Sequence, residues 1–275
     1  HNTPAKTKQP RRFPQVLSDG KPLVGEASGR LALARWIADE KNPLTARVMV
    51  NRVWRWHFGR GLVATTDNFG LLGDKPSHPE LLDWLAAWFM DNGWSVKKLN
   101  TLILSSATYQ MSTTASPSAL KADANNVLLS RAPLRRLEAE PLRDSLLALG
   151  GLLDKQVGGF VWTFENYKLV FNHTSEDATT YESNRRALYL PVIRNHVYDL
   201  FELFDFPDPG TVNGNRADST IAPQALYLMN SPLVLRATES IAKALLKEDE
   251  LNNAQRVQRL YAQVFNRPPT VKETQ

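Results

Sequence analysis

Cysteine is missing from all 275 residues of this chain. Its absence excludes disulfides, thiolate nucleophiles, zinc–thiolate centres and a covalent haem attachment site within the chain. Long apolar runs are missing too: none approaches the roughly 20 residues that a membrane helix needs, so no transmembrane segment is expected. The first residues, HNTPAKTKQPRR, lack the apolar core of a signal peptide.

Short catalytic motifs are equally scarce. The sequence contains no G-x-S-x-G, no phosphate-binding glycine loop and no Ser–Lys signature. Histidine occurs five times, and no acid stands at a spacing that would make His57 a catalytic base. His57 is therefore predicted to be a packed, hydrogen-bonded residue, and the motifs identify no reaction.

An excess of basic residues is confined to the first part of the chain. The net charge is +5, and four of the basic residues stand among the first twelve: Lys6, Lys8, Arg11 and Arg12. The remaining 29 basic residues face 28 acidic ones, which leaves the rest of the chain almost neutral. A nucleic-acid interface needs a basic stripe on the folded body, so nucleic-acid binding is not expected.

The sequence pattern predicts a mainly α, multi-helix globular domain. Residues 1–29 read as a basic tail or linker and residues 30–275 as a single domain. A small β or extended insertion is expected around residues 158–196, where β-branched and aromatic residues gather, and a loop at residues 112–131. Thr270 precedes the last residues as if capping a helix that is cut off, so the C-terminal end looks truncated.

The stretch NPLTARVMVNRVWRWHFGRGLV, residues 42–63, predicts an amphipathic core helix. At helical spacing its apolar face contains Val50, Val53, Trp54 and His57, widened by Met49 and Trp56. Asn51, Arg52 and Arg55 fall on a polar face that is expected to be solvated or ion-paired. Helix starts are predicted at three serines: Ser95 and Ser231 as N-caps, and Ser77 in a capping box with Glu80.

Four arginines form the clearest candidate binding site, because they gather around the extended segments: Arg185, Arg186, Arg194 and Arg216. Guanidinium groups clamp anionic ligands. The same side chains are also predicted to make structural ion pairs with nearby acids, namely Glu182, Asp205 and Asp218. The sequence leaves both interpretations open.

A polar loop downstream offers oxygen ligands for a hard cation such as calcium: Asp208, Asn213, Asn215 and Asp218. The register of an EF-hand is not met, and turn formation by Asp and Asn side chains explains the same composition. Candidate acids for hydrolysis of a glycan lie in the same region: Glu165, Glu176, Asp177, Asp205 and Asp218.

A colinear set of stretches resembles one known family. The set comprises SGRLALARWIADEKNPLTARVMVNRVWRWHFGRGLV, DNFGLLGDKPSHPELLDWLAAWFMDNGWSVKKLNTLILSSATYQMS, RRLEAEPLRDSLLALGG, RRALYLPV, FDFPDP, STIAPQALYLMNSPLV and RLYAQVFNRPPT. Over about residues 28–270 it is similar to the planctomycete-specific C-terminal domain of unknown function. That resemblance implies an exported multidomain protein, located in the periplasm or cell envelope.

In that family an upstream cytochrome-c-like domain is common, so the resemblance implies that any haem c belongs to an upstream segment. No cofactor is expected in this chain itself. The leading hypothesis is an accessory or interaction module that docks neighbouring domains or partner envelope proteins, linked to polysaccharide processing or electron transfer. The alternative is a glycan-active hydrolase that uses loop carboxylates of residues 160–220.

Overall fold

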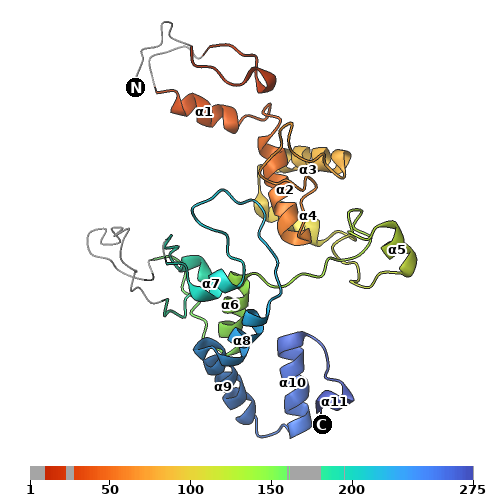
Figure 1. Ribbon diagram of the computed structural model, residues 1–275, viewed down its shortest axis with the longest axis vertical. Helices are drawn as coiled ribbons and strands as arrows, with labels where there is room; N and C mark the ends of the chain where they lie inside the picture. The colour runs from red at the N-terminus through yellow and green to blue at the C-terminus, as the bar shows by residue number, and fades with distance from the viewer. Residues whose placement is uncertain (1–9, 23–27, 160, 162–180, 195, 275) are drawn as a thin grey trace, which may run out of the picture. The chain divides into compact units, whose positions relative to one another are not determined.

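A computed structural model of the chain describes residues 10–22, 28–159, 161, 181–194 and 196–274. These residues are mainly helical (Figure 1), and β structure among them is limited to two isolated bridges, Arg12–Pro22 and Asp154–Arg185. The chain divides into two compact units, His1–Arg135 and Arg136–Gln275, called unit 1 and unit 2. The mainly α prediction is confirmed.

Unit 1 is built around one helix. Its elements are η1 (Gln15–Leu17), α1 (Arg30–Ile37), α2 (Thr45–Phe58), α3 (Pro79–Asp91), α4 (Val96–Leu104) and α5 (Pro117–Ala122). Helix α2 packs against both α3 and α4. It ends at Gly59, whose φ of 80° is the left-handed conformation that glycine adopts most readily.

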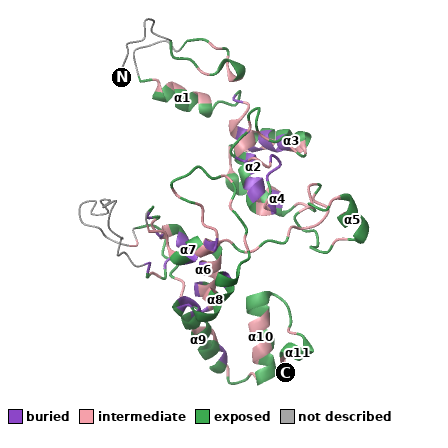
Figure 2. Cartoon of the chain, in the orientation of Figure 1, coloured by how far each residue is buried: buried purple, intermediate pink, exposed green. Residues whose placement is uncertain are grey.

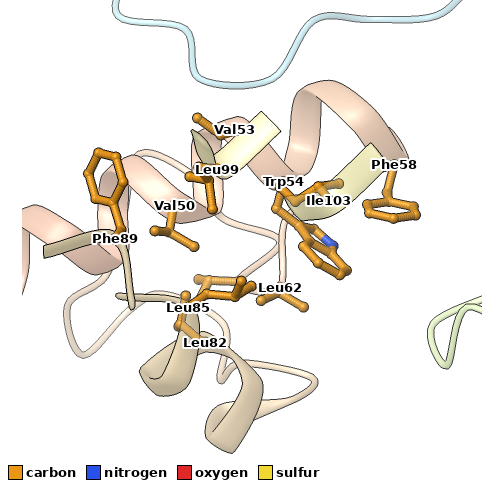
Figure 3. Close-up of a cluster of buried hydrophobic side chains, with 11 residues drawn as sticks. Val50, Val53, Trp54, Phe58, Leu62, Leu82, Leu85, Phe89, Leu99 and Ile103 are labelled. Carbon is orange, nitrogen blue, oxygen red and sulfur yellow. The ribbon is translucent and has the colours of Figure 1, made fainter. Parts of the chain in front are cut away.

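The core of unit 1 lies between these three helices (Figure 3). Helix α2 contributes Val50, Trp54 and Phe58 to this cluster, and α3 contributes Leu82, Leu85 and Phe89. Helix α4 adds Leu99 and Ile103, and the chain after α2 adds Leu62 and Val63. Each such side chain contributes about 1.5–3 kcal/mol when it leaves water. This cluster fixes α2 as the central helix, as the sequence predicts.

The predicted faces of α2 are partly wrong. Asn51 and Arg55, expected on a solvated or ion-paired face, are buried, whereas Met49 and Trp56, expected to widen the apolar face, are exposed. For Asn51 the reason is the chain after α2, where residues 61–63 are buried. It brings backbone polar groups into the interior, and a polar side chain must face them.

Asn51 supplies that partner. Its amide nitrogen donates to the Val63 carbonyl at 2.9 Å, and its amide oxygen accepts from the Val63 N–H at 2.9 Å. The approach is close because Gly61 intervenes, where a Cβ would stand 2.5 Å from the Val63 oxygen and 2.7 Å from the Asn51 amide nitrogen. His57 is hydrogen-bonded as predicted, with Nε2 2.9 Å from Oδ1 of Asn100.

Unit 2 is arranged around α6 (Ala139–Leu149). Its other elements are η3 (Ala187–Tyr189), α7 (Asp199–Leu203), α8 (Ala222–Asn230), α9 (Pro232–Leu246), α10 (Asn253–Phe265) and α11 (Val271–Thr274). Helix α6 contacts η3, α7 and α9. Leu147, Leu200, Phe201, Phe204 and Leu233 form the core between them.

Burial is uneven along unit 2 (Figure 2). Helices α6 and α9 hold buried residues, whereas none of the α10 residues is buried. The close packing of α6 and α9 depends on Gly150, because a Cβ there would lie 3.1 Å from Cα of Ala237. The Ser240 hydroxyl also donates to the Gly150 carbonyl at 2.6 Å.

The described part of residues 158–196 is irregular. It contains the bridge from Arg185 to Asp154 and the single turn η3, which agrees with the extended alternative of the predicted insertion. The predicted loop at 112–131 is wrong at its centre, because Ser116 accepts from Ala119 N–H and starts α5. That residues 30–275 form a single domain stays a prediction. No helix within the described ranges has the length and apolar character of a membrane span.

The Asn51 contacts predict a large loss of stability on substitution. Asn51→Leu keeps the number and branching of the side-chain heavy atoms but leaves two buried backbone groups of Val63 without a partner, so unit 1 should lose about 2–5 kcal/mol of unfolding free energy. Tryptophan fluorescence in urea measures this loss, since six of the seven tryptophans lie in unit 1.

The matched control is Arg52→Leu, which introduces the same residue at the next position. Arg52 is exposed and only approaches Asp67 at 3.8 Å, so this variant should lose less than about 1 kcal/mol. Equal losses for the two variants would contradict the role assigned to Asn51.

Candidate functional site

Unit 2 carries an open groove of about 710 Å³ between α6, η3 and α7. Nine of its fourteen lining residues are apolar: Pro141, Ala148, Leu153, Ala187, Leu188, Leu190, Val192, Phe201 and Phe206. The polar lining residues are Glu140, Asp144, Ser145, Arg186 and Arg216. Two of the four predicted arginines, Arg186 and Arg216, therefore meet at one surface.

The wall of this groove is held by Arg143, whose side chain is only 1% exposed. Its guanidinium donates to the carbonyls of Ser183 and Arg185, the latter at 2.8 Å, and to Oδ1 of Asp144 at 3.3 Å. The same Asp144 oxygen accepts from the Ala187 N–H at 2.8 Å. Two neighbouring residues of α6 thus bond to alternate residues of the segment 183–187.

Arg185 and Arg186 have opposite environments. Arg185 is buried, donates to the carbonyls of Gln156 and Gly158 at 3.0 and 2.6 Å, and lies 4.6 Å from the ring of Tyr189. It forms an ion pair with Asp154, at 3.8 Å. Arg186 is exposed at the groove. The first arginine is therefore structural, and only the second is available to a ligand.

Arg216 is bound by two acids, one in α6 and one in the residue that precedes α6. It donates to both carboxylate oxygens of Glu140, at 2.6 and 2.8 Å, and lies 3.1 Å from Glu138. Burial lowers the pKa of Arg216, but the bond and charge of Glu140 outweigh it, so the pKa lies above its usual value. Ion pairing was predicted for the four arginines together, with Glu182, Asp205 and Asp218 as partners, whereas Arg216 pairs with Glu138 and Glu140.

Asp205 and Asp218 pair with Arg136 instead, at 2.6 and 3.5 Å. Asp205 also accepts from the Ser219 N–H at 2.8 Å and from the Ser219 hydroxyl at 2.9 Å. Burial alone would raise the pKa of Asp205, but the Ser219 bonds and the Arg136 charge lower it overall. A carboxyl group with a lowered pKa stays ionised at neutral pH and is a poor general acid.

The calcium candidates show turn chemistry. Oδ1 of Asp208 accepts from the Gly210 N–H at 2.7 Å, which is the turn formation by Asp side chains that the composition of the loop also predicts. Asn213 and Asn215 are exposed. In the described part of the chain, no three His, Asp or Glu side chains come together as a metal site. Calcium binding stays a prediction without support from this geometry.

The remaining predicted residues divide into two groups. Arg194 is exposed and does not line the groove. The acids Glu165, Glu176 and Asp177 lie outside the described residues.

The structure also adds two arginines that the sequence interpretation missed, Arg136 and Arg143. Arg143 gives a faint signal, because it stands among leucines on the core side of α6.

A partly buried tyrosine lies near the same wall. Burial, followed by the neighbouring Tyr227, raises the pKa of Tyr198 to about 12, against a smaller opposing effect of Arg143. Tyr198 stacks on Tyr181 with ring centroids 5.0 Å apart. Its hydroxyl is therefore neutral at all physiological pH values, and it serves packing rather than proton transfer.

Comparison with known proteins identifies one family. The model of PSD1, described as a protein of unknown function (DUF1553), matches residues 29–275. No curated protein and no solved structure matches the chain. The functional argument therefore depends on the groove and its side chains.

The lowered pKa of Asp205 predicts how the stability of unit 2 changes in acid. A carboxyl group whose folded pKa is depressed stabilises the fold above its unfolded pKa, and this contribution is lost as pH falls through the folded value. Asp205→Asn removes the charge and keeps a residue that tolerates the positive φ of 60° at this position. At neutral pH this variant should lose about 1–3 kcal/mol.

The difference between wild type and Asp205→Asn should shrink as the pH falls below the usual aspartate pKa and through the lowered pKa of Asp205, because the wild-type carboxyl then becomes protonated. Amide hydrogen exchange over residues 199–230 measures the local stability. Ser219→Ala should shift the acid limb of the wild-type curve toward higher pH. Parallel pH curves for all three proteins would contradict the assignment.

Proposed function

We propose that this chain, which belongs to the PSD1 family of proteins of unknown function, is an interaction module that binds a polypeptide segment in the groove of unit 2. The observation that carries the proposal is the composition of the groove. Its floor is apolar and open to solvent, and most of its charged side chains are already bonded within the chain. Such a surface favours burial of apolar side chains over chemistry on a ligand.

The apolar floor is continuous with exposed side chains. Leu188 of η3 is 74% exposed and Val192 is 50% exposed, and both line the groove. Apolar side chains in water gain free energy when a partner covers them. The walls are secured by the Arg143 bonds, so the groove is formed before a partner arrives, which reduces the entropy cost of binding.

A polypeptide fits this surface better than a glycan. A sugar presents many hydroxyl groups and needs many free hydrogen-bonding partners. Here Glu140 bonds to Arg216 through both carboxylate oxygens, and one Asp144 oxygen accepts from both Ala187 and Arg143. Each of these carboxylates therefore already uses about half of its acceptor sites within the chain, which reduces what it offers to sugar hydroxyls.

We extend the proposal to the whole protein as the sequence resemblance implies. The module would dock a neighbouring domain of the same polypeptide or a partner protein of the envelope, in polysaccharide processing or electron transfer. Any haem would be carried by another segment. The alternative, a glycan hydrolase, gains no support from Asp205 or Asp218, since Arg136 holds both.

The groove predicts a specific loss of binding. The purified chain is used to select from a displayed library of random peptides, and the affinity of the enriched peptides is measured by fluorescence anisotropy. Leu188→Glu places a charge on the apolar floor and should weaken binding by roughly tenfold or more.

Val212→Glu is the matched control, because Val212 is 90% exposed but does not line the groove, and its binding should equal that of the wild type. If no peptide is enriched, or if Leu188→Glu binds as well as Val212→Glu, the groove is not a peptide site.

A further inference from the structure

One charged side chain of the groove remains without a partner. Among the described residues, no hydrogen bond or ion pair engages the guanidinium of Arg186, whereas the other charged lining residues, Glu140, Asp144 and Arg216, are all bonded. This contrast is the basis for assigning the chemistry of the occupant.

The fold itself turns Arg186 outward. Ser183, Arg185 and Ala187 supply the backbone groups that face α6, and Arg185 and Ala187 are buried. Arg186 lies between these two and is exposed, at the residue before η3. Its position is therefore fixed by the bonds on either side of it, while its guanidinium stays in solvent.

Covering the groove changes the free energy of that guanidinium. An occupant that buries Leu188 and the neighbouring floor also removes water from Arg186, and a desolvated cation is costly unless an anion replaces the water. A carboxylate compensates best, through two parallel N–H···O bonds. A neutral or basic occupant does not compensate the desolvation free energy of the guanidinium, so Arg186 selects against it.

We propose, on the basis of the function proposed above, that the occupant is an apolar polypeptide segment carrying one aspartate or glutamate, whose side-chain carboxylate pairs with Arg186. The other end of the groove limits the number of acids. Arg216 already holds both Glu138 and Glu140, so that cluster carries one surplus negative charge and repels a second acid. The preferred segment therefore has a single acid with apolar neighbours.

The test is a double-mutant cycle between protein and peptide. An enriched peptide is synthesised with an amidated C-terminus, in versions with the acid, with glutamine and with lysine at the acidic position. Wild-type protein should bind the acidic version about tenfold more tightly than the glutamine version. Arg186→Gln should bind both equally, and Arg186→Glu should prefer the lysine version.

Arg194→Glu is the matched control, because Arg194 is also exposed but does not line the groove. It should keep the wild-type preference for the acidic peptide. Thermal unfolding of each variant shows whether it is folded, and the lysine preference of Arg186→Glu is a gain that misfolding cannot produce.

Three results would overturn the proposal: an enriched set without acidic residues, an unchanged peptide preference in Arg186→Gln, or binding that requires a free C-terminal carboxylate instead of a side chain. Each leaves the proposed function intact if Leu188→Glu still weakens peptide binding while Val212→Glu does not. Failure of the proposed function itself is recognised separately, by the absence of any enriched peptide.

Discussion

The guanidinium of Arg143 determines how unit 2 is put together. It lies inside the unit, on α6, and bonds to the carbonyls of Ser183 and Arg185. Those carbonyls belong to irregular chain, which has no sheet or helix of its own to satisfy its backbone groups. Removing the guanidinium would leave the carbonyls of Ser183 and Arg185 without this donor and would leave Asp144 with only its bond from the Ala187 N–H, so the segment that leads into η3, and with it the groove floor, depends strongly on this side chain.

Unit 1 uses the same device with an uncharged side chain. Asn51 lies on the central helix α2 and bonds to both backbone groups of Val63 in the chain that follows. In each unit a polar residue on a core helix fixes an adjacent irregular segment. Asn51 does so without a desolvated charge. Arg143 reaches more acceptors, and Asp144 compensates part of its charge.

These two residues also mark where the sequence is informative and where it is not. Helical periodicity and local start signals predict the central position of α2 and the N-caps at Ser95 and Ser231, because these depend on neighbours within one turn. The predicted capping box at Ser77 is wrong: the Ser77 hydroxyl donates to the Leu62 carbonyl at 3.2 Å. Periodicity separates apolar from polar positions, but it does not show that a backbone segment will cover the polar face.

The prediction of ion pairs from sequence is limited in the same way, because it considers only acids that are near in the chain. The sequence predicts that Arg216 pairs with nearby acids, but its partners, Glu138 and Glu140, lie more than 70 residues away in the chain. Proximity in sequence therefore finds the charged region and assigns the wrong pairs. The correct pairs matter for function, since they hold Glu140 and Asp205 as ionic partners of arginine. For Asp205 the lowered pKa keeps the carboxyl ionised near neutral pH, so it is a poor general acid. The contacts that shape the groove thus favour recognition over acid–base chemistry by these carboxylates.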